Sequence, residues 1–213
     1  MHTMTRILLV VALLVLSACN ATTAKINKVV WNVGDSIIAG TANTIIQSEL
    51  TSSKGLLPIY QAHGGFSLVR PEHKIYWRER LAEIQRIDLR ADVVVVSLGT
   101  NDAGYLKDNP SLNAYDEFED AMREFMEGIP AGTRVLWIPQ TEASAIATDR
   151  GAQWLQIIAA MISVGEDYAN LEFLDYETFV NGKGFTIAEV TTDSVHPNAK
   201  GAELLAEMIV GAI

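Results

Sequence analysis

Short apolar runs alternate with longer amphipathic stretches along most of the chain. The runs predict strands at 28–33, 57–61, 92–98, 134–139 and 171–175. The clearest is the unbroken valine run at 93–96, which is typical of a parallel strand buried on both faces. Spaced apolar positions predict helices at 41–50, 76–86, 115–127, 152–162 and 197–213. We expect the last helix to start at Pro197, because proline suits the first helical position.

This alternation of strands and helices favours an α/β fold with a mostly parallel, five-stranded sheet between two helical layers. Right-handed crossovers bring the C-terminal ends of parallel strands to one edge, where such sheets bind ligands. Ser36, Gly65 and Asn101 each follow a predicted strand. Topology therefore brings these three residues together, although they lie far apart in the sequence.

The first residues have the pattern of an export signal. Arg6 precedes an apolar run at 7–16, too short to span a bilayer, which is typical of a secretory signal. The residues 16–19, Leu-Ser-Ala-Cys, are similar to a bacterial lipobox, in which the cysteine is acylated. An ordinary signal cut nearby is the alternative, although Leu16 is bulky for the small residue expected three positions before that cut. We expect a signal at 1–18, a lipidated Cys19, a tether at 19–27 and one domain at 28–213.

Composition narrows the possible partners. The chain has 213 residues and a net charge of −10, which argues against a nucleic-acid partner because phosphate binding needs clustered lysine and arginine. Cys19 is the only cysteine, so an intramolecular disulfide is excluded. We expect an exported protein that contacts a membrane of the cell envelope through its lipidated N-terminus and faces the periplasm or the exterior.

Four short blocks in a fixed order carry the candidate chemistry. They are Gly34-Asp35-Ser36, Gly64-Gly65-Phe66-Ser67, Gly99-Thr100-Asn101-Asp102 and Asp193-Ser194-Val195-His196. Together they resemble the SGNH (GDSL-type) hydrolase family of esterases and lipases, over nearly all of the chain from Val29 onward. The resemblance implies a three-layer α/β/α sandwich of flavodoxin-like topology and hydrolysis of an ester substrate without a cofactor.

The blocks supply the parts of a serine triad. A serine hydroxyl needs a base to become nucleophilic, and imidazole suits that task near neutral pH. We expect Ser36 to be the nucleophile, His196 the base and Asp193 the carboxylate that orients it, as the resemblance implies. The alternatives are a helix-capping role for Ser36, His63 as a rival base, and loop solvation for Asp193.

The second and third blocks supply candidate oxyanion donors. We expect the backbone N–H groups of Ser36 and Gly65 and the side-chain amide of Asn101 to face the developing negative charge. Gly64 is an alternative to Gly65, and a turn role is the alternative for both Gly65 and Asn101. The resemblance makes Asp35 structural, and we expect the same of Asp102. The three scattered histidines beyond residue 27 and a lone cysteine do not form a metal-ligand set.

The sequence therefore predicts a serine esterase, and the absence of a long insertion favours short acyl groups. Acyl transfer to a cell-envelope polysaccharide and non-catalytic binding of a glycan or lipid are the alternatives. Tyr105, Leu106 and the polar segment 107–113 are candidates for a wall of the acyl pocket or for a plain connection. Residues 140–142 lie at the same predicted edge, without an assigned role.

Overall fold

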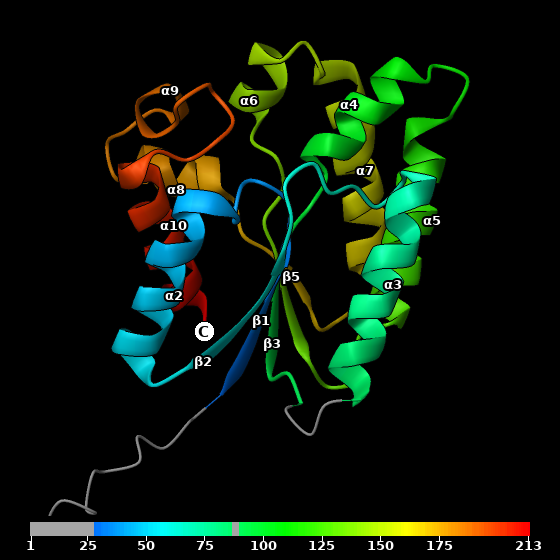
Figure 1. Cartoon of the computed structure of the whole chain (residues 1–213). Helices are drawn as coiled ribbons and strands as arrows, with labels where there is room; N and C mark the ends of the chain where they lie inside the picture. Colours follow the sequence, from blue (N-terminus) through cyan, green and yellow to red (C-terminus); the bar gives the residue numbers. More distant parts are fainter. Residues whose placement is uncertain (1–27, 87–89) are drawn as a thin grey trace, which may run out of the picture.

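Five strands rich in valine and other apolar residues form the centre of the molecule (Figure 1). The computed structural model describes residues 28–86 and 90–213. The strands are β1 (Val29–Gly34), β2 (Leu57–Ala62), β3 (Val93–Ser97), β4 (Arg134–Trp137) and β5 (Leu171–Phe173). The predicted signal, tether and lipidated Cys19 lie outside the described residues and stay predictions.

The sheet has the order β2-β1-β3-β4-β5, and every neighbouring pair is parallel. This order confirms the predicted fold class. The chain adds β2 on one side of β1 and the later strands on the other, so the direction of winding reverses between β1 and β3. Open α/β sheets bind ligands at such a reversal, beside the C-terminal strand ends.

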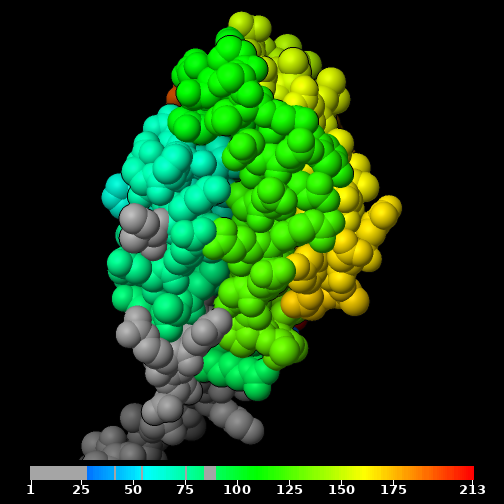
Figure 2. Space-filling view, turned by 90° about the vertical axis from the view of Figure 1, so that its right-hand side faces the viewer, coloured from blue at the N-terminus to red at the C-terminus, as the bar shows by residue number. Residues whose placement is uncertain are grey.

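Helices cover both faces of the sheet (Figure 1). One layer holds α2 (Gly40–Lys54), α8 (Tyr176–Gly182), α9 (Ile187–Val190) and α10 (Ala199–Ala212). The other holds α3 (Pro71–Arg86), α4 (Thr100–Asp108), α5 (Ala114–Glu127) and α7 (Gly151–Asp167). In Figure 2 the side chains of α3, α5 and α7 form a continuous surface over their face. The short α6 (Glu142–Ala147) lies beyond the end of β4.

Alternate residues of β3 pack against opposite layers, as expected for a strand buried on both faces. Val93 and Val95 contribute to the core under α2 and α10, whereas Val94 and Val96 contribute to the core under α5 and α7. All four valines are at most 2% exposed. The β-branched run identified in the sequence is therefore the central strand shared by both cores.

The structure adds short helices that apolar spacing did not predict. α4 begins within the third block, at Thr100, and α6, α8 and α9 have only four to seven residues each. Such helices show too few turns for a period to emerge and depend on capping and packing. Asp175, expected to end a strand, instead caps α8 by accepting a hydrogen bond from the N–H of Thr178 at 2.9 Å.

Two longer helices begin at other residues than the spacing indicated. α3 starts at Pro71 rather than at 76, because its first turn is polar and carries no apolar spacing. α10 starts at Ala199, capped by the Asn198 side chain, and Pro197 lies before it in a bridge with Thr191. Within residues 28–86 and 90–213, no helix is long and apolar enough to cross a membrane.

Gly201 lets α10 pack closely against the end of α9. A Cβ at Gly201 would lie 2.0 Å from the carbonyl oxygen of Val190 and 3.1 Å from the Tyr176 hydroxyl. The Tyr176 hydroxyl also donates a hydrogen bond to the Gly201 carbonyl at 2.8 Å. Close packing here fixes the start of α10, which immediately follows the fourth sequence block.

We expect Gly201→Ala to lower the free energy of unfolding by about 1–3 kcal/mol, because overpacking forces α10 away from α9. Gly211→Ala is the matched control in the same helix, where a Cβ would meet nothing within 4 Å. That control should be neutral or stabilising by up to about 1 kcal/mol, because alanine favours helix. Urea unfolding followed by circular dichroism measures both. Equal stabilities of the two variants would contradict the packing argument.

Candidate active site

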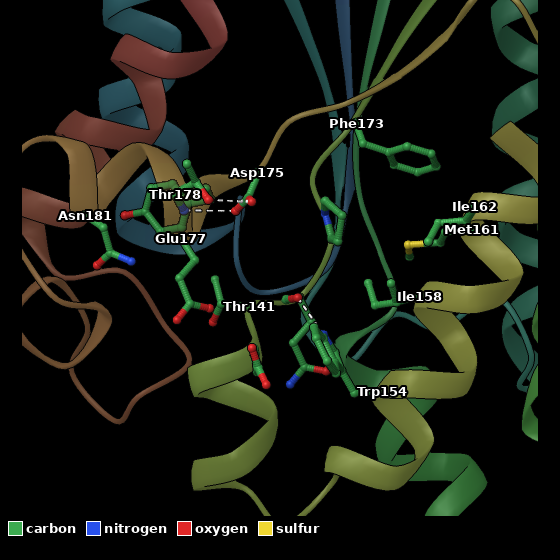
Figure 3. Close-up of a pocket in the computed structure, with 14 residues that line it drawn as sticks. Thr141, Trp154, Ile158, Met161, Ile162, Phe173, Asp175, Glu177, Thr178 and Asn181 are labelled. Carbon is green, nitrogen blue, oxygen red and sulfur yellow. Dashed lines mark hydrogen bonds between the residues drawn. The ribbon is translucent and has the colours of Figure 1, made fainter.

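Two adjoining hollows lie at the C-terminal edge of the sheet. The larger is a cleft of about 530 Å³ beyond β4 and β5, bordered by α6, α7 and α8 (Figure 3). The smaller is lined by Ile37 and Val195, which directly neighbour two of the candidate catalytic residues. Both hollows are lined by Pro139, Gln140, Thr141 and Tyr176. The two hollows therefore share a wall, and the smaller one lies beside the first, third and fourth sequence blocks.

Ser36 lies in the tight turn between β1 and α2. The turn crosses closely over β3, where the N–H of Asp35 donates to the carbonyl of Ser97 at 3.1 Å. A Cβ at Gly34 would lie 2.8 Å from that same carbonyl oxygen. Glycine at this position is thus required by the approach of two strands. The turn leaves Ser36 partly exposed at the edge.

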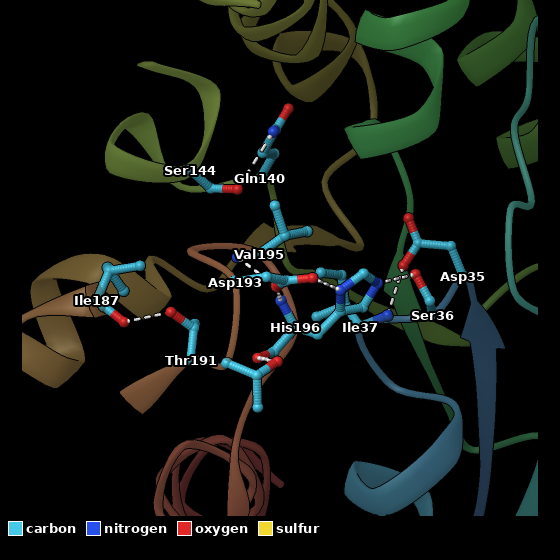
Figure 4. Close-up of polar contacts among 11 residues, drawn as sticks. Asp35, Ser36, Ile37, Gln140, Ser144, Ile187, Thr191, Asp193, Val195 and His196 are labelled. Atoms are coloured by element: carbon cyan, nitrogen blue, oxygen red, sulfur yellow. Dashed lines mark hydrogen bonds and ion pairs between the residues drawn. The ribbon is translucent and has the colours of Figure 1, made fainter. Parts of the chain in front are cut away.

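A chain of hydrogen bonds joins Ser36, His196 and Asp193 (Figure 4). The Nε2 atom of His196 lies 2.8 Å from the Oγ atom of Ser36. Its Nδ1 atom lies 2.6 Å from Oδ2 of Asp193. The structure brings together three residues that the sequence separates by up to 160 positions.

Asp193 also shapes the loop that holds His196. Its Oδ1 atom accepts hydrogen bonds from the backbone N–H groups of Val195 at 3.1 Å and His196 at 2.8 Å. Ser194, which lies between Asp193 and Val195, adopts a left-handed conformation with φ of 65°. Hydrogen bonds from the backbone and the ring of His196 lower the pKa of Asp193 to about 2. The carboxylate therefore stays ionised and holds the ring in one orientation.

The rival histidine occupies a different environment. The Nδ1 atom of His63 lies 3.0 Å from the carbonyl oxygen of Gly64, and its ring makes an edge contact with Tyr76. His63 does not form a hydrogen bond with Ser36. Geometry thus favours His196 as the partner of Ser36.

Asn101 links the first two sequence blocks. Its Nδ2 atom donates to Oδ2 of Asp35 at 3.2 Å and to the carbonyl of Phe66 at 2.9 Å. Both amide hydrogens of Asn101 therefore form hydrogen bonds, and the longer bond is the one to Asp35. Catalytic hydrogen bonds often align only when substrate is bound, so a donor of this kind can still serve an oxyanion.

Asp35 is fully buried and accepts a second hydrogen bond from the N–H of Ile37 at 2.9 Å. Burial raises the pKa of Asp35 to about 7, the hydrogen bond from Ile37 opposes the shift, and the nearby Asp102 carboxyl adds to it. The Asp35 carboxyl therefore changes its protonation state near neutral pH.

Asp102 fastens the second block to the third. Its Oδ1 atom accepts hydrogen bonds from the Ser67 hydroxyl and the Leu68 N–H, each at 2.7 Å, and from the Val69 N–H at 2.9 Å. The side chain is fully buried, and burial raises its pKa above the ordinary value despite these hydrogen bonds. Its geometry is that of a loop-organising residue.

Gly65 has the conformation that a close turn requires. Its φ is 80°, in the left-handed region that favours glycine. Among the described residues, the backbone N–H groups of Ser36 and Gly65 donate no hydrogen bond to a backbone carbonyl. The same holds for Gly64, so unpaired donors do not separate the two glycines. The left-handed conformation accounts for glycine at 65 whether or not its N–H binds an oxyanion.

Residues beyond the four blocks complete the edge. Leu106 is buried in the core, whereas the ring of Tyr105 lies under the guanidinium of Arg70 at 5.3 Å. Gln140 and Trp154 line the cleft, and the Trp154 Nε1–H donates to the Gln140 carbonyl at 2.8 Å. The position of Gln140 after a strand was a sequence signal, whereas that of Trp154 within an amphipathic helix was not.

Comparisons with known proteins agree with this architecture. A catalytic mutant of an acetylxylan esterase from Geobacillus stearothermophilus is 18% identical, with a TM-score of 0.67, covering 87% of this chain and 94% of that one. A protein described as a GDSL-like lipase from Parabacteroides merdae is 17% identical, with a TM-score of 0.67 and coverages of 88% and 96%. The lipase/acylhydrolase from Enterococcus faecalis is 19% identical, with a TM-score of 0.67 and coverages of 87% and 95%. These similarities show the fold.

The family follows from the sequence itself. No curated protein matches the chain by sequence. In the described residues, no group of three or more histidine, cysteine and acidic side chains could hold a metal ion. The model of the GDSL-like lipase/acylhydrolase family matches residues 33–204, which include all four blocks. The chain therefore belongs to the GDSL-like lipase/acylhydrolase family and is an esterase of the SGNH type.

Proposed function

We propose that this esterase hydrolyses short-chain acyl esters with Ser36 as nucleophile, His196 as general base and acid, and Asp193 as orienting carboxylate. The observation that carries this proposal is the continuous hydrogen-bond chain, 2.8 Å from Ser36 to His196 and 2.6 Å from His196 to Asp193. A base within hydrogen-bond reach of a serine hydroxyl is the geometry that activates it.

The reaction proceeds in two halves. His196 Nε2 takes the proton of Ser36 as its oxygen attacks the acyl carbonyl, and the same ring then protonates the leaving alcohol. Water, deprotonated by His196, releases the acid from the acyl-enzyme. Asp193 accepts the Nδ1–H hydrogen bond throughout and stabilises the imidazolium that forms in each half.

We propose that the N–H groups of Ser36 and Gly65 and the amide of Asn101 hold the oxyanion. These groups come from the C-terminal ends of β1, β2 and β3, which are adjacent in the sheet. The bond from Asn101 to Asp35 is the weaker of its two, at 3.2 Å, and is the one that the oxyanion replaces. Protonation of Asp35 weakens that bond further and so frees the donor.

The preference for short acyl chains rests on the connections around Ser36. Among the described residues, α4 begins within the third block, and only residues 109–113 join it to α5. Within the described residues, these connections contain no long inserted lid that could enclose a long acyl chain. Rates on p-nitrophenyl esters from acetyl to palmitoyl test the preference, and a maximum at palmitoyl would contradict it.

Replacement of either triad residue should nearly abolish ester hydrolysis. We expect Ser36→Ala and His196→Ala each to lower kcat by roughly 10⁴-fold or more, and the double variant to be little worse, because triad residues act as a unit. His63→Ala is the matched control and should retain most of the activity. The measurement is p-nitrophenyl acetate hydrolysis by folded protein. A Ser36→Ala enzyme with more than about a tenth of the activity would disprove the nucleophile.

Asn101→Ala separates the oxyanion hole from the triad. Loss of one oxyanion donor typically lowers kcat by about 10²–10³-fold, and KM should change much less because the donor acts on developing charge. Asn109→Ala is the control, since Asn109 is an amide at the opposite end of α4 that donates a hydrogen bond to the Tyr105 carbonyl. Steady-state kinetics decide the matter: a normal kcat with a strongly raised KM would indicate a binding role instead.

Asp35→Asn should change how stability depends on pH. The folded pKa of Asp35, about 7, lies above the value of 3.8 for the free side chain, so the native state holds the extra proton. Its contribution to stability is complete below pH 3.8 and is lost as pH rises through 7. Over this window the wild type should therefore lose stability relative to Asp35→Asn, by at most about 1.4 kcal/mol per pH unit.

Chemical denaturation from pH 4 to pH 8 measures this difference. Asp120→Asn controls for the loss of one exposed carboxylate on α5. If the stability difference between wild type and Asp35→Asn stayed constant across the range, Asp35 would titrate alike in the folded and unfolded states, and the proton-holding role would be wrong.

A further inference from the structure

The cleft beyond β4 and β5 has one apolar wall and one polar wall (Figure 3). The apolar wall comes from α7 and β5 and consists of Trp154, Ile158, Met161, Ile162 and Phe173. The polar wall comes from α6, α8 and the segments before them and includes Thr141, Glu142, Asp175, Glu177, Thr178 and Asn181. A ligand that fits both walls has an apolar face and an opposite edge rich in polar groups.

Gln140 at the base of the cleft has an unused acceptor. Its side chain is only 9% exposed and lines both the cleft and the small hollow beside Val195. The Oε1 atom is buried without a hydrogen-bond partner, and the Nε2 atom reaches only the Ser144 hydroxyl, at 3.4 Å. A buried acceptor without a partner lowers stability, so a ligand that donates a hydrogen bond here is favoured.

The charge of the cleft selects among donors. Three carboxylates line it, from Glu142, Asp175 and Glu177, and no lysine or arginine does. Asp175 accepts hydrogen bonds from Thr178, and Glu177 accepts one from the Ala143 N–H. In the part of the chain that the structure describes, neither carboxylate forms an ion pair with a basic side chain. Glu142 is exposed on the rim. Such a site repels anions and accepts uncharged hydroxyl donors.

The cleft lies on the side of Ser36 from which the alcohol leaves. His196 protonates that alcohol, and Val195, its neighbour, lines the hollow that shares Gln140 with the cleft. Gly65 follows β2, at the other end of the strand order from β4 and β5. An ester whose oxyanion faces Gly65 and whose leaving oxygen faces His196 therefore extends its alcohol part toward the cleft.

We propose that this cleft binds the alcohol part of the ester and that this alcohol is an uncharged sugar unit. The inference rests on the proposed function. One face of the sugar ring, made of C–H groups, packs on Trp154, whose indole is held by its hydrogen bond to the Gln140 carbonyl. Ring hydroxyls donate to Gln140 Oε1 and to the carboxylates of the polar wall.

Reversal of the first half-reaction gives a direct readout of this site. A sugar hydroxyl bound in the cleft can take the place of water: His196 removes its proton, and its oxygen attacks the acyl carbonyl. The bond from that carbonyl to Ser36 Oγ breaks, and His196 returns the proton to Ser36. The products are an acylated sugar and free enzyme, and no further reactant is needed.

The experiment uses p-nitrophenyl acetate as acyl donor, with either methyl β-glucoside or methyl β-glucuronide as acceptor. The two acceptors differ at one position, where the glucoside carries a hydroxymethyl group and the glucuronide carries a carboxylate. Mass spectrometry gives the ratio of acetylated glycoside to free acetate, which is normalised within each reaction. We expect transfer to the glucoside to exceed transfer to the glucuronide by at least about fivefold, as one like-charge contact in water predicts.

Variants of the cleft then identify its walls. Trp154→Ala should reduce transfer to the glucoside, and Trp154→Phe should restore most of it because an aromatic face remains. Leu155→Ala is the matched control, since this neighbouring residue is 63% exposed and does not line the cleft. Glu142→Lys should raise the ratio of glucuronide to glucoside transfer by more than about fivefold, because it removes a like charge and adds an opposite one. Glu166→Lys makes the same charge change near the C-terminal end of α7 and should leave that ratio unchanged.

The outcomes separate this inference from the proposed function. If p-nitrophenyl acetate is hydrolysed through Ser36 but neither glycoside is acetylated, the esterase assignment stands and the sugar site is wrong. Equal transfer to the two glycosides, or equal effects of Glu142→Lys and Glu166→Lys, would also overturn the sugar site. Absence of hydrolysis by folded wild-type protein would instead overturn the proposed function.

Discussion

The parallel register of β1 with both β2 and β3 is the constraint on which the active site depends. In that register the last residue of β1, Gly34, is paired with the ends of both neighbours, Ala62 and Ser97. The first three sequence blocks therefore begin at the same level of the sheet. Gly34 has no space for a side chain there, because the β1 turn crosses directly over the Ser97 carbonyl.

Two buried carboxyls turn this shared level into a defined site. Asp102 holds the loop after β2 by three hydrogen bonds, and Asp35 accepts from the turn that carries Ser36 and from Asn101. Both carboxyls lie in a low-dielectric interior. There an unpaired polar group is unfavourable, whereas a hydrogen-bonded one holds its partners in a fixed arrangement. Burial raises the pKa of each of these carboxyls, whereas hydrogen bonds lower the pKa of the exposed Asp193 carboxyl.

The two sides of Ser36 differ in character. On the β2 side lies the turn that contains Gly65. On the other side the cleft extends over β4 and β5, with an aromatic wall, an acidic wall and a buried acceptor at Gln140. This asymmetry is the physical basis of our proposal that the enzyme selects the alcohol part of its ester more strictly than the acyl part.

The sequence by itself determined the fold class and the residues of the four blocks. A valine run at 93–96 indicates burial on both faces, and strands alternating with helices leave few arrangements of a parallel sheet. The short helices α6, α8 and α9 were not predictable, because segments of one or two turns are stabilised by caps and packing rather than by a period. Only the tertiary structure placed His196 rather than His63 within hydrogen-bond distance of Ser36, engaged both amide hydrogens of Asn101, and placed Trp154 beside Gln140. These relations depend on distances between segments far apart in the chain, which local patterns do not encode.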